Sequence, residues 1–87
     1  MINNVSEERI RLIFGLKLRH ARIDKKLSLS ELADRAGLSV SYLNEIEKGK
    51  KYPKTDKITL LANALDTDYD SMVSLKLPKP LAPIATL

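Results

Sequence analysis

The sequence predicts an all-helical domain of five short helices with no β-strand. Apolar residues recur three or four positions apart along most of the chain, which is the spacing of one helix face. Serine or aspartate residues suited to helix N-caps precede four of these segments, and glycines suited to helix ends follow two of them. At 87 residues the chain is long enough for a single domain with one modest core.

The first helix is predicted from about residue 7 to residue 25. Ser6 is suited to be its N-cap, and acidic residues follow where the helix dipole favours negative charge. Lys25 and Lys26 end the helix where the dipole favours positive charge. The residues expected to face inward are Ile10, Ile13, Phe14, Leu18 and Ala21.

Two short helices are predicted on either side of Gly37. Residues 28–31 form a capping box, in which Ser28 and Glu31 bond to each other's backbone amides. The helix that they open ends at Gly37, because glycine adopts a left-handed conformation without a Cβ clash. Ser39 caps the next helix, from about Val40 to Lys48, and Gly49 ends it in the same way. The inward residues of this pair are Leu32, Ala33, Ala36, Leu43 and Ile46.

Two further helices complete the predicted domain. Pro53 discourages helix at Tyr52, so residues 50–53 are expected to form a loop before a fourth helix from about Thr55 to Leu65. Residues 67–70 can cap a short fifth helix. The expected inward residues are Ile58, Leu61, Ala62 and Leu65 in the fourth helix, and Met72, Val73 and Leu75 in the fifth.

The end of the chain differs from the rest. We expect the helical domain to cover residues 1–76 and a proline-rich apolar tail to cover residues 77–87, which hold three of the four prolines. These prolines oppose regular structure through residue 83. Two interpretations of the tail stay open. It is either the start of a linker to a missing C-terminal region or a native terminus that packs loosely on the domain.

Composition excludes several classes of function. The chain has no cysteine, and its one histidine, His20, lies between arginines, so we expect no disulfide, metal, cofactor or catalytic site. We therefore predict a protein that is not an enzyme and that holds no small-molecule ligand in this segment. No apolar run approaches the ~18 residues of a membrane span, so we expect a cytoplasmic protein with no membrane partner. The net charge of +4 weakly favours an anionic partner.

The spacing of residues around Gly37 is typical of a helix-turn-helix. Counting Leu29 as the first position, Leu32 is fourth, Ala33 fifth, Gly37 ninth, Leu43 fifteenth and Ile46 eighteenth. The fifth residue must be small because the second helix crosses close over it, and the ninth must tolerate a positive φ at the sharp turn. The last two positions hold the second helix against the first. Five constrained positions and two caps at the right spacing make a specific signal.

The chain resembles the phage-repressor/Cro type (XRE family) of helix-turn-helix domain. The resemblance is carried by Leu27–Ala33, Gly37–Ser39 and Tyr42–Pro53, and it extends from about Gly15 to Val73. It implies a five-helix lambda-repressor-like fold with the helix-turn-helix at helices two and three. The implied function is sequence-specific double-stranded DNA binding by a transcriptional regulator, with repression as the expected mode. A homodimer is expected because one short helix reads too few base pairs.

The resemblance also implies which residues contact DNA. Because Leu43 and Ile46 face the core, the opposite face of the third helix is expected in the major groove. The residues expected at base edges are Val40, Ser41, Tyr42 and Glu45. Those expected at phosphates are Ser28, Ser30, Ser39, Asn44, Lys48, Lys50, Lys51 and Lys54. Arg22 and Glu47 match positions that form a partly buried ion pair, which implies a structural role.

Several of these assignments have alternatives that the sequence leaves open. Glu45 either accepts a hydrogen bond from a cytosine amino group or pairs with a nearby lysine. Tyr42 either reaches DNA or packs against the start of the third helix. The family often has glutamine where this chain has Leu29, so either another donor such as Ser30 compensates or DNA binding is weaker and differently oriented.

A second class of function uses the same fold without reading DNA. It is a helical protein-interaction or antitoxin module, favoured by Leu29, Val40 and Glu45 on the face expected to be exposed. The two classes differ in their response to salt. A DNA binder loses affinity for duplex DNA with a log–log slope of about −0.9 per neutralised phosphate, and a protein-interaction module shows no such slope.

Overall fold

The computed structural model describes residues 6–76, and all structural statements below refer to them. The five helices are α1 (Glu7–Asp24), α2 (Leu29–Ala36), α3 (Val40–Glu47), α4 (Thr55–Ala64) and α5 (Tyr69–Val73), and the described residues contain no strand. The predicted all-helical, five-helix fold is confirmed. The first, third and fourth helices were each predicted one residue too long, because Lys25, Lys48 and Leu65 are C-caps. The predicted tail, 77–87, lies outside the described residues.

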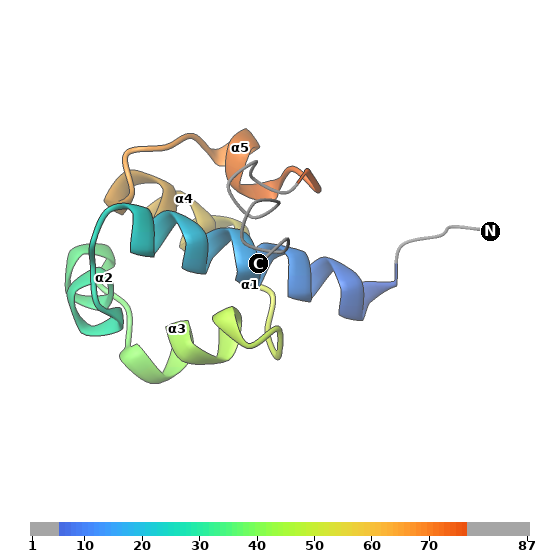
Figure 1. Ribbon diagram of the computed structural model, residues 1–87, viewed down its shortest axis with the longest axis horizontal. Coiled ribbons are helices and arrows are strands. Elements are labelled where there is room, and N and C mark those ends of the chain that lie inside the picture. Colours follow the sequence, from blue (N-terminus) through green and yellow to red (C-terminus); the bar gives the residue numbers. More distant parts are fainter. Residues whose placement is uncertain (1–5, 77–87) are drawn as a thin grey trace, which may run out of the picture.

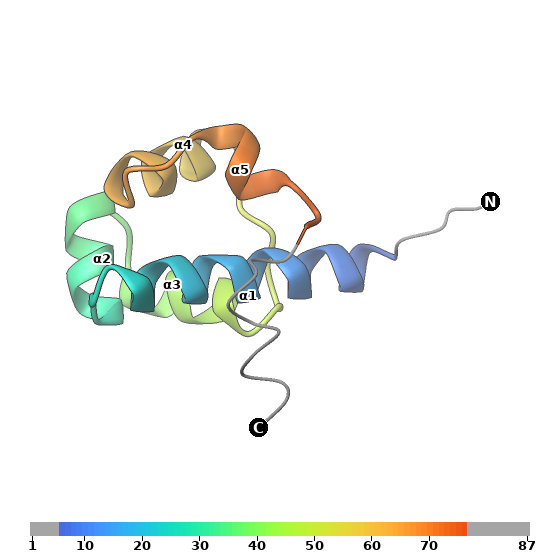
Figure 2. The same ribbon diagram turned by 45° about the horizontal axis from the view of Figure 1, so that its top comes forward.

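The long helix α1 runs through the middle of the fold. Figure 1 shows α3 on one side of α1 and α4 with α5 on the other. In the turned view of Figure 2, α3 lies partly behind α1, and α4 and α5 remain together above it. Helix α1 contacts α3 and α5, α2 contacts α3 and α4, and α4 contacts α5. No helix among the described residues is both long and apolar enough to cross a membrane.

The core between these helices is entirely apolar among the described residues. It consists of Phe14, Leu18, Leu27, Leu32, Ala33, Ala36, Leu43, Ile46, Ile58, Leu61, Ala62, Leu65 and Met72. Ile10, Ile13, Ala21 and Val73 are half-buried. The prediction that Leu75 faces inward is wrong, because its side chain is 48% exposed. Helix α5 ends before it and Ser74 is extended, so the helical spacing used to place Leu75 does not apply there.

Serine or aspartate side chains cap four helix starts, as the sequence predicts. Ser6, Ser28, Ser39 and Asp68 each accept a hydrogen bond from the backbone amide three residues further on, at 3.0–3.1 Å. The cap of α4, Lys54, makes no such side-chain bond. The turn between α2 and α3 has Gly37 in the left-handed conformation, with a φ of +71°. Four of the five helices thus have a start fixed by local sequence.

A glycine allows α1 and α3 to cross with their backbones in contact. A Cβ atom added to Gly15 would lie 2.5 Å from the carbonyl oxygen of Ile46 and 2.8 Å from that of Glu47. Any larger residue at this position would therefore overlap the backbone of α3. This crossing fixes the depth at which the C-terminal end of α3 sits against the rest of the domain.

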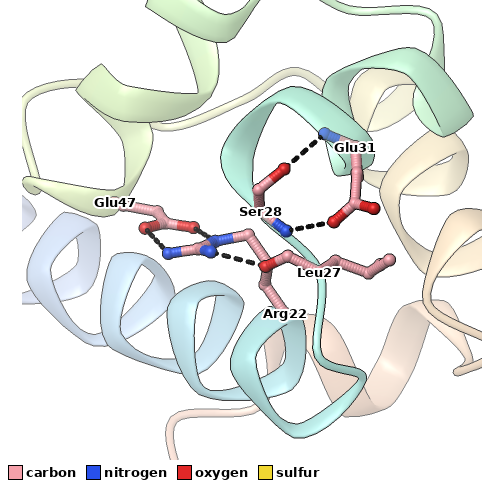
Figure 3. Close-up of polar contacts among 5 residues, drawn as sticks. All are labelled: Arg22, Leu27, Ser28, Glu31 and Glu47. Atoms are coloured by element: carbon pink, nitrogen blue, oxygen red, sulfur yellow. Dashed lines mark hydrogen bonds and ion pairs between the residues drawn. The ribbon is translucent and has the colours of Figure 1, made fainter.

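An ion pair lies near the same crossing. Arg22 Nε donates to Glu47 Oε2 at 2.7 Å, and Arg22 Nη2 donates to Glu47 Oε1 at 3.1 Å. Arg22 Nη1 also donates to the Leu27 carbonyl oxygen at 2.7 Å (Figure 3). The two side chains are only 13% and 7% exposed. One guanidinium thus joins α1 to the end of α3 and to the segment that leads into α2.

Candidate nucleic-acid interface

Helix α3 has one face in the core and the other on the surface. Leu43 and Ile46 are fully buried, whereas Val40 and Ser41 are exposed. Tyr42 is half-buried and packs against the core. The N-terminal half of α3, which follows the N-cap Ser39, therefore presents small and polar groups to the surface.

Beside this face the surface is hollowed into an open groove of about 900 Å³. Its walls come from α3, the turn before it, the loop at residues 50–54, the first turn of α4 and one side chain of α1. The predicted site residues that line it are Ser39, Ser41, Tyr42, Glu45, Lys50, Lys51 and Lys54. The fold thus brings base-edge candidates and phosphate candidates to one concave surface.

The charge of the groove is almost entirely positive. Its charged lining residues are Arg11, Glu45, Lys50, Lys51, Lys54 and Lys57. All but one of them are lysine or arginine. A concave surface of this charge concentrates positive potential, which attracts a polyanion such as a nucleic-acid backbone.

Sequence reasoning missed two of these cations, Arg11 and Lys57. Arg11 lies on α1, and its Nε donates to the carbonyl oxygen of Gly49 at 3.2 Å, just beyond the end of α3. Nothing in the local sequence connects Arg11 to this loop, since 38 positions separate the two residues. Lys57 follows Lys54 by three positions, so helical spacing from Lys54 could have indicated it.

Glu45 pairs with a lysine of the same groove. Its Oε1 lies 3.1 Å from Lys51 Nζ, and that nitrogen also lies 5.8 Å from the centre of the Tyr42 ring. This is the lysine-pairing alternative that the sequence left open for Glu45. Tyr52 lines the groove as well, with its ring held edge-on to Phe14 at a centroid distance of 5.1 Å. Burial raises the pKa of the Tyr52 phenol.

Two other predicted phosphate contacts lie in a separate, smaller hollow. Asn44 and Lys48 line it together with Arg19 and Leu29, in about 240 Å³ between α1, α2 and α3. Leu29 is half-buried and packs against the core, so it is not part of an exposed apolar face. The predicted phosphate residues therefore occupy two sides of α3.

The last two predicted phosphate contacts, Ser28 and Ser30, lie at the start of α2. Ser28 and Glu31 form the predicted capping box (Figure 3). The Ser28 amide donates to Glu31 Oε1 at 2.8 Å, and the Ser28 hydroxyl oxygen accepts from the Glu31 amide at 3.0 Å. The backbone hydrogen bond from Ser28 lowers the pKa of the Glu31 carboxyl. Ser30 is exposed beside this box. The Ser28 amide is already engaged, which leaves the hydroxyl proton as the group that Ser28 itself can donate.

The chain is similar to a known family and to proteins named as transcriptional regulators. Residues 18–71 match the helix-turn-helix family HTH_3. The transcriptional regulator ClgR of Mycobacterium tuberculosis is 38% identical over 56 residues, which cover 64% of this chain and 50% of ClgR. The HTH-type transcriptional repressor RghR of Bacillus subtilis is 38% identical over 61 residues, which cover 69% of this chain and 45% of RghR. The chain thus spans about half the length of these two relatives.

A solved structure is also similar to this chain. The crystal structure of the restriction-modification controller protein C.AhdI from Aeromonas hydrophila superposes with a TM-score of 0.69 at 35% sequence identity. The match covers 71% of this chain and 94% of the controller protein. The similarity therefore extends over nearly the whole of that controller protein and over about seven tenths of this chain.

Proposed function

Because the chain belongs to the helix-turn-helix family HTH_3, we propose that it is a sequence-specific double-stranded DNA-binding domain of a transcriptional regulator. The observation that carries the proposal is the cationic groove beside the exposed face of α3. The relatives named as a transcriptional regulator and as a transcriptional repressor support regulation, with repression as the mode. The residues that line the groove are mostly cations and hydroxyl groups, which are suited to binding a polyanion, and they include no cysteine or histidine.

In this proposal α3 enters the major groove and its outer residues read base edges. Val40 packs on a thymine methyl group, Ser41 bonds to an acceptor or a donor, and Glu45 accepts from a cytosine amino group. Tyr42 stands next to these three residues and adds a base-edge contact. The roles follow from the exposure of Val40 and Ser41 and from the position of all of them on one side of the helix.

The phosphate contacts in this proposal surround α3. Lysines of the loop after α3 and the first turn of α4 hold one strand, and Arg11 adds a contact from α1. The remaining donors lie at the starts of α2 and α3 and in the smaller hollow. The full set of proposed phosphate contacts is Arg11, Ser28, Ser30, Ser39, Asn44, Lys48, Lys50, Lys51, Lys54 and Lys57.

We further propose that the protein acts as a homodimer in the cytoplasm. Helix α3 has only eight residues, so one copy reads a short half-site, and two copies are needed for useful specificity. Two copies related by a two-fold axis would recognise an inverted repeat.

Selection of duplexes from a randomised pool at moderate salt tests this function. We expect an inverted repeat whose half-sites are about one helical turn apart. Ser41→Ala should then change the preference at one position of each half-site, whereas Thr59→Ala, which removes an exposed hydroxyl from α4, should leave the preference unchanged. A single enriched half-site would contradict the dimer. A folded protein that enriches no sequence would contradict DNA reading and favour the protein-interaction module.

A further inference from the structure

Glu45 is the one carboxylate among the residues that line the cationic groove. It lies 3.1 Å from Lys51, and the Lys51 ammonium is also within cation–π distance of the Tyr42 ring, at 5.8 Å. Glu45 and Tyr42 both belong to α3 and line the groove, and Lys51 belongs to the loop that follows. Glu45 and Tyr42, which are proposed to read bases, thus hold the ammonium group of Lys51, which is proposed to bind phosphate.

Other lysines of the groove are not held in this way. Within residues 6–76, Lys50 and Lys54 have no carboxylate at ion-pair distance, and the Lys57 ammonium lies 3.7 Å from Asp56, which does not line the groove. The Glu45–Lys51 pair is exposed, at 41% and 53% of the side-chain surface. Exposed pairs are weak, so a donor that replaces Lys51 at the Glu45 carboxylate is enough to open this pair.

We propose that the Glu45–Lys51 pair is a specificity filter for DNA. On a duplex without the correct base, Lys51 can bind a phosphate only if it leaves Glu45. The Glu45 carboxylate is then unpaired and is repelled by the DNA phosphates, which makes this phosphate contact unfavourable. On the correct site, an exocyclic amino group in the major groove, cytosine N4 or adenine N6, donates to Glu45 and replaces Lys51. Lys51 is then released to a phosphate. This inference rests on the proposed function, because it specifies how that same face discriminates between duplexes.

The filter makes base reading and phosphate binding depend on each other. With the correct base, both charged groups end with a partner, so one more phosphate is neutralised and one more counterion is released. With an incorrect base, the pair stays closed and that phosphate contact is lost. Lys51 should therefore contribute to the salt dependence of binding on the correct site and not on other DNA.

The experiment measures the affinity of the full 87-residue chain for two duplexes between ~50 and ~200 mM salt. One duplex is the best selected site, and the other has the same composition with scrambled half-sites. The variants are Glu45→Gln, Lys51→Gln and the double variant, each checked for folding by its thermal melt. For the scrambled duplex we expect Glu45→Gln to raise affinity by about two- to fivefold and to steepen the salt slope by up to about 0.9.

The Lys51 variants separate the filter from a general charge effect. In the wild-type background, Lys51→Gln should leave binding to the scrambled duplex nearly unchanged while weakening binding to the selected site. In the Glu45→Gln background, it should remove the gain on the scrambled duplex. Equal weakening of scrambled binding by Lys51→Gln in both backgrounds would overturn the filter, because Lys51 would then already contact phosphate.

Asp66→Asn is the matched control. It makes the same change in net charge and frees Lys25 from another exposed pair, at 3.6 Å, whose members do not line the groove. If it raises scrambled binding as much as Glu45→Gln does, the effect is one of net charge and the filter is wrong. Failure of the wild-type chain to bind either duplex at any salt would instead overturn the proposed function, and the filter with it.

Discussion

At the scale of single residues, the junction between α1 and α3 depends on one charge pair and one glycine. Arg22 and Glu47 satisfy each other through two hydrogen bonds with little exposure to water. Gly15 lets the two backbones meet nearby. Both features hold the end of α3 in place, so changes at either should act first on stability and only then on DNA binding.

Glu47→Ala should lower the free energy of unfolding by about 3 kcal/mol or more. It removes one partner of a shielded ion pair and leaves the Arg22 charge uncompensated. Thermal or urea unfolding measures the loss, with Lys25→Gln as control because it breaks the exposed Lys25–Asp66 pair and should change stability by only about 0.5 kcal/mol. A Glu47→Ala variant that melts like wild type but loses DNA binding would contradict the structural role.

Gly15→Ala should lower the free energy of unfolding by about 1–3 kcal/mol, because the new methyl group overlaps two carbonyl oxygens of α3. Gly37→Ala offers a comparison with a different cause. No atom lies within 4 Å of an added Cβ there, so its expected cost of about 1–2 kcal/mol comes from the left-handed backbone alone. The folded Gly15→Ala variant should also bind DNA less tightly. A Gly15→Ala variant as stable as wild type would show that α3 does not contact α1 at this depth.

At the scale of secondary-structure elements, carboxylates stabilise the starts of two helices. A backbone hydrogen bond from Ser28 lowers the pKa of Glu31 at the start of α2. A side-chain hydrogen bond from Ser71 lowers the pKa of Asp68 at the start of α5. The ordinary pKa values of these groups are 4.5 and 3.8. Both groups are therefore more acidic in the folded protein than in the unfolded chain.

The direction of these shifts predicts loss of stability in acid. A depressed pKa contributes stability above the ordinary value, and this contribution disappears as the pH falls through the lower, folded-state value. Melting temperature should therefore fall as the pH goes from about 5 to about 3. The double variant Glu31→Gln/Asp68→Asn keeps neutral caps, so its melting temperature should fall less than that of wild type over this pH range, which we call the acid limb. Asp34→Asn, whose side chain makes no hydrogen bond or ion pair within residues 6–76, should not show this smaller fall. An unchanged acid limb in the double variant would contradict the assignment.

At the scale of the whole molecule, the groove combines side chains that are far apart in the sequence. Arg11 from α1, the lysines of the loop after α3 and Lys57 from α4 meet beside the outward face of α3. In the proposed complex this arrangement separates two kinds of contact, since the outer side chains at residues 40–42 and 45 read bases and the lysines and Arg11 of the groove bind phosphates. Changes to the two groups should therefore have different signatures.

Lys57→Gln should weaken binding to all duplexes by a similar factor and make the salt slope shallower by about 0.9, because it removes one phosphate contact. Its sequence preference should match that of wild type. Ser41→Ala should do the reverse, with a changed preference and an unchanged slope. Affinity measurements over a salt series on the selected and scrambled duplexes distinguish the two patterns. A changed sequence preference in Lys57→Gln would place this lysine at a base edge instead.

Local sequence determined the helices, their caps and most of the core. Ser28, Glu31 and Gly37 act through bonds that span a few residues, and the inward stripe of each helix follows from its own period, so no knowledge of the fold is needed to place them. The same reasoning failed for Leu75, because the helix that set the period had already ended. The helix-turn-helix was predictable for the same reason, since its constraints lie within eighteen consecutive positions.

Only the tertiary structure decided which distant side chains meet. Arg11 reaches the Gly49 carbonyl across 38 positions, and Gly15 meets the backbone of Ile46 because α1 and α3 cross there. Glu45 faces Lys51 rather than another lysine because of the path of the loop after α3. These contacts depend on crossing angles and loop paths, which arise from packing the whole core and have no period in the sequence. The sequence by itself therefore determined the family and the helix-turn-helix, and the packing of the core determined the groove beside it.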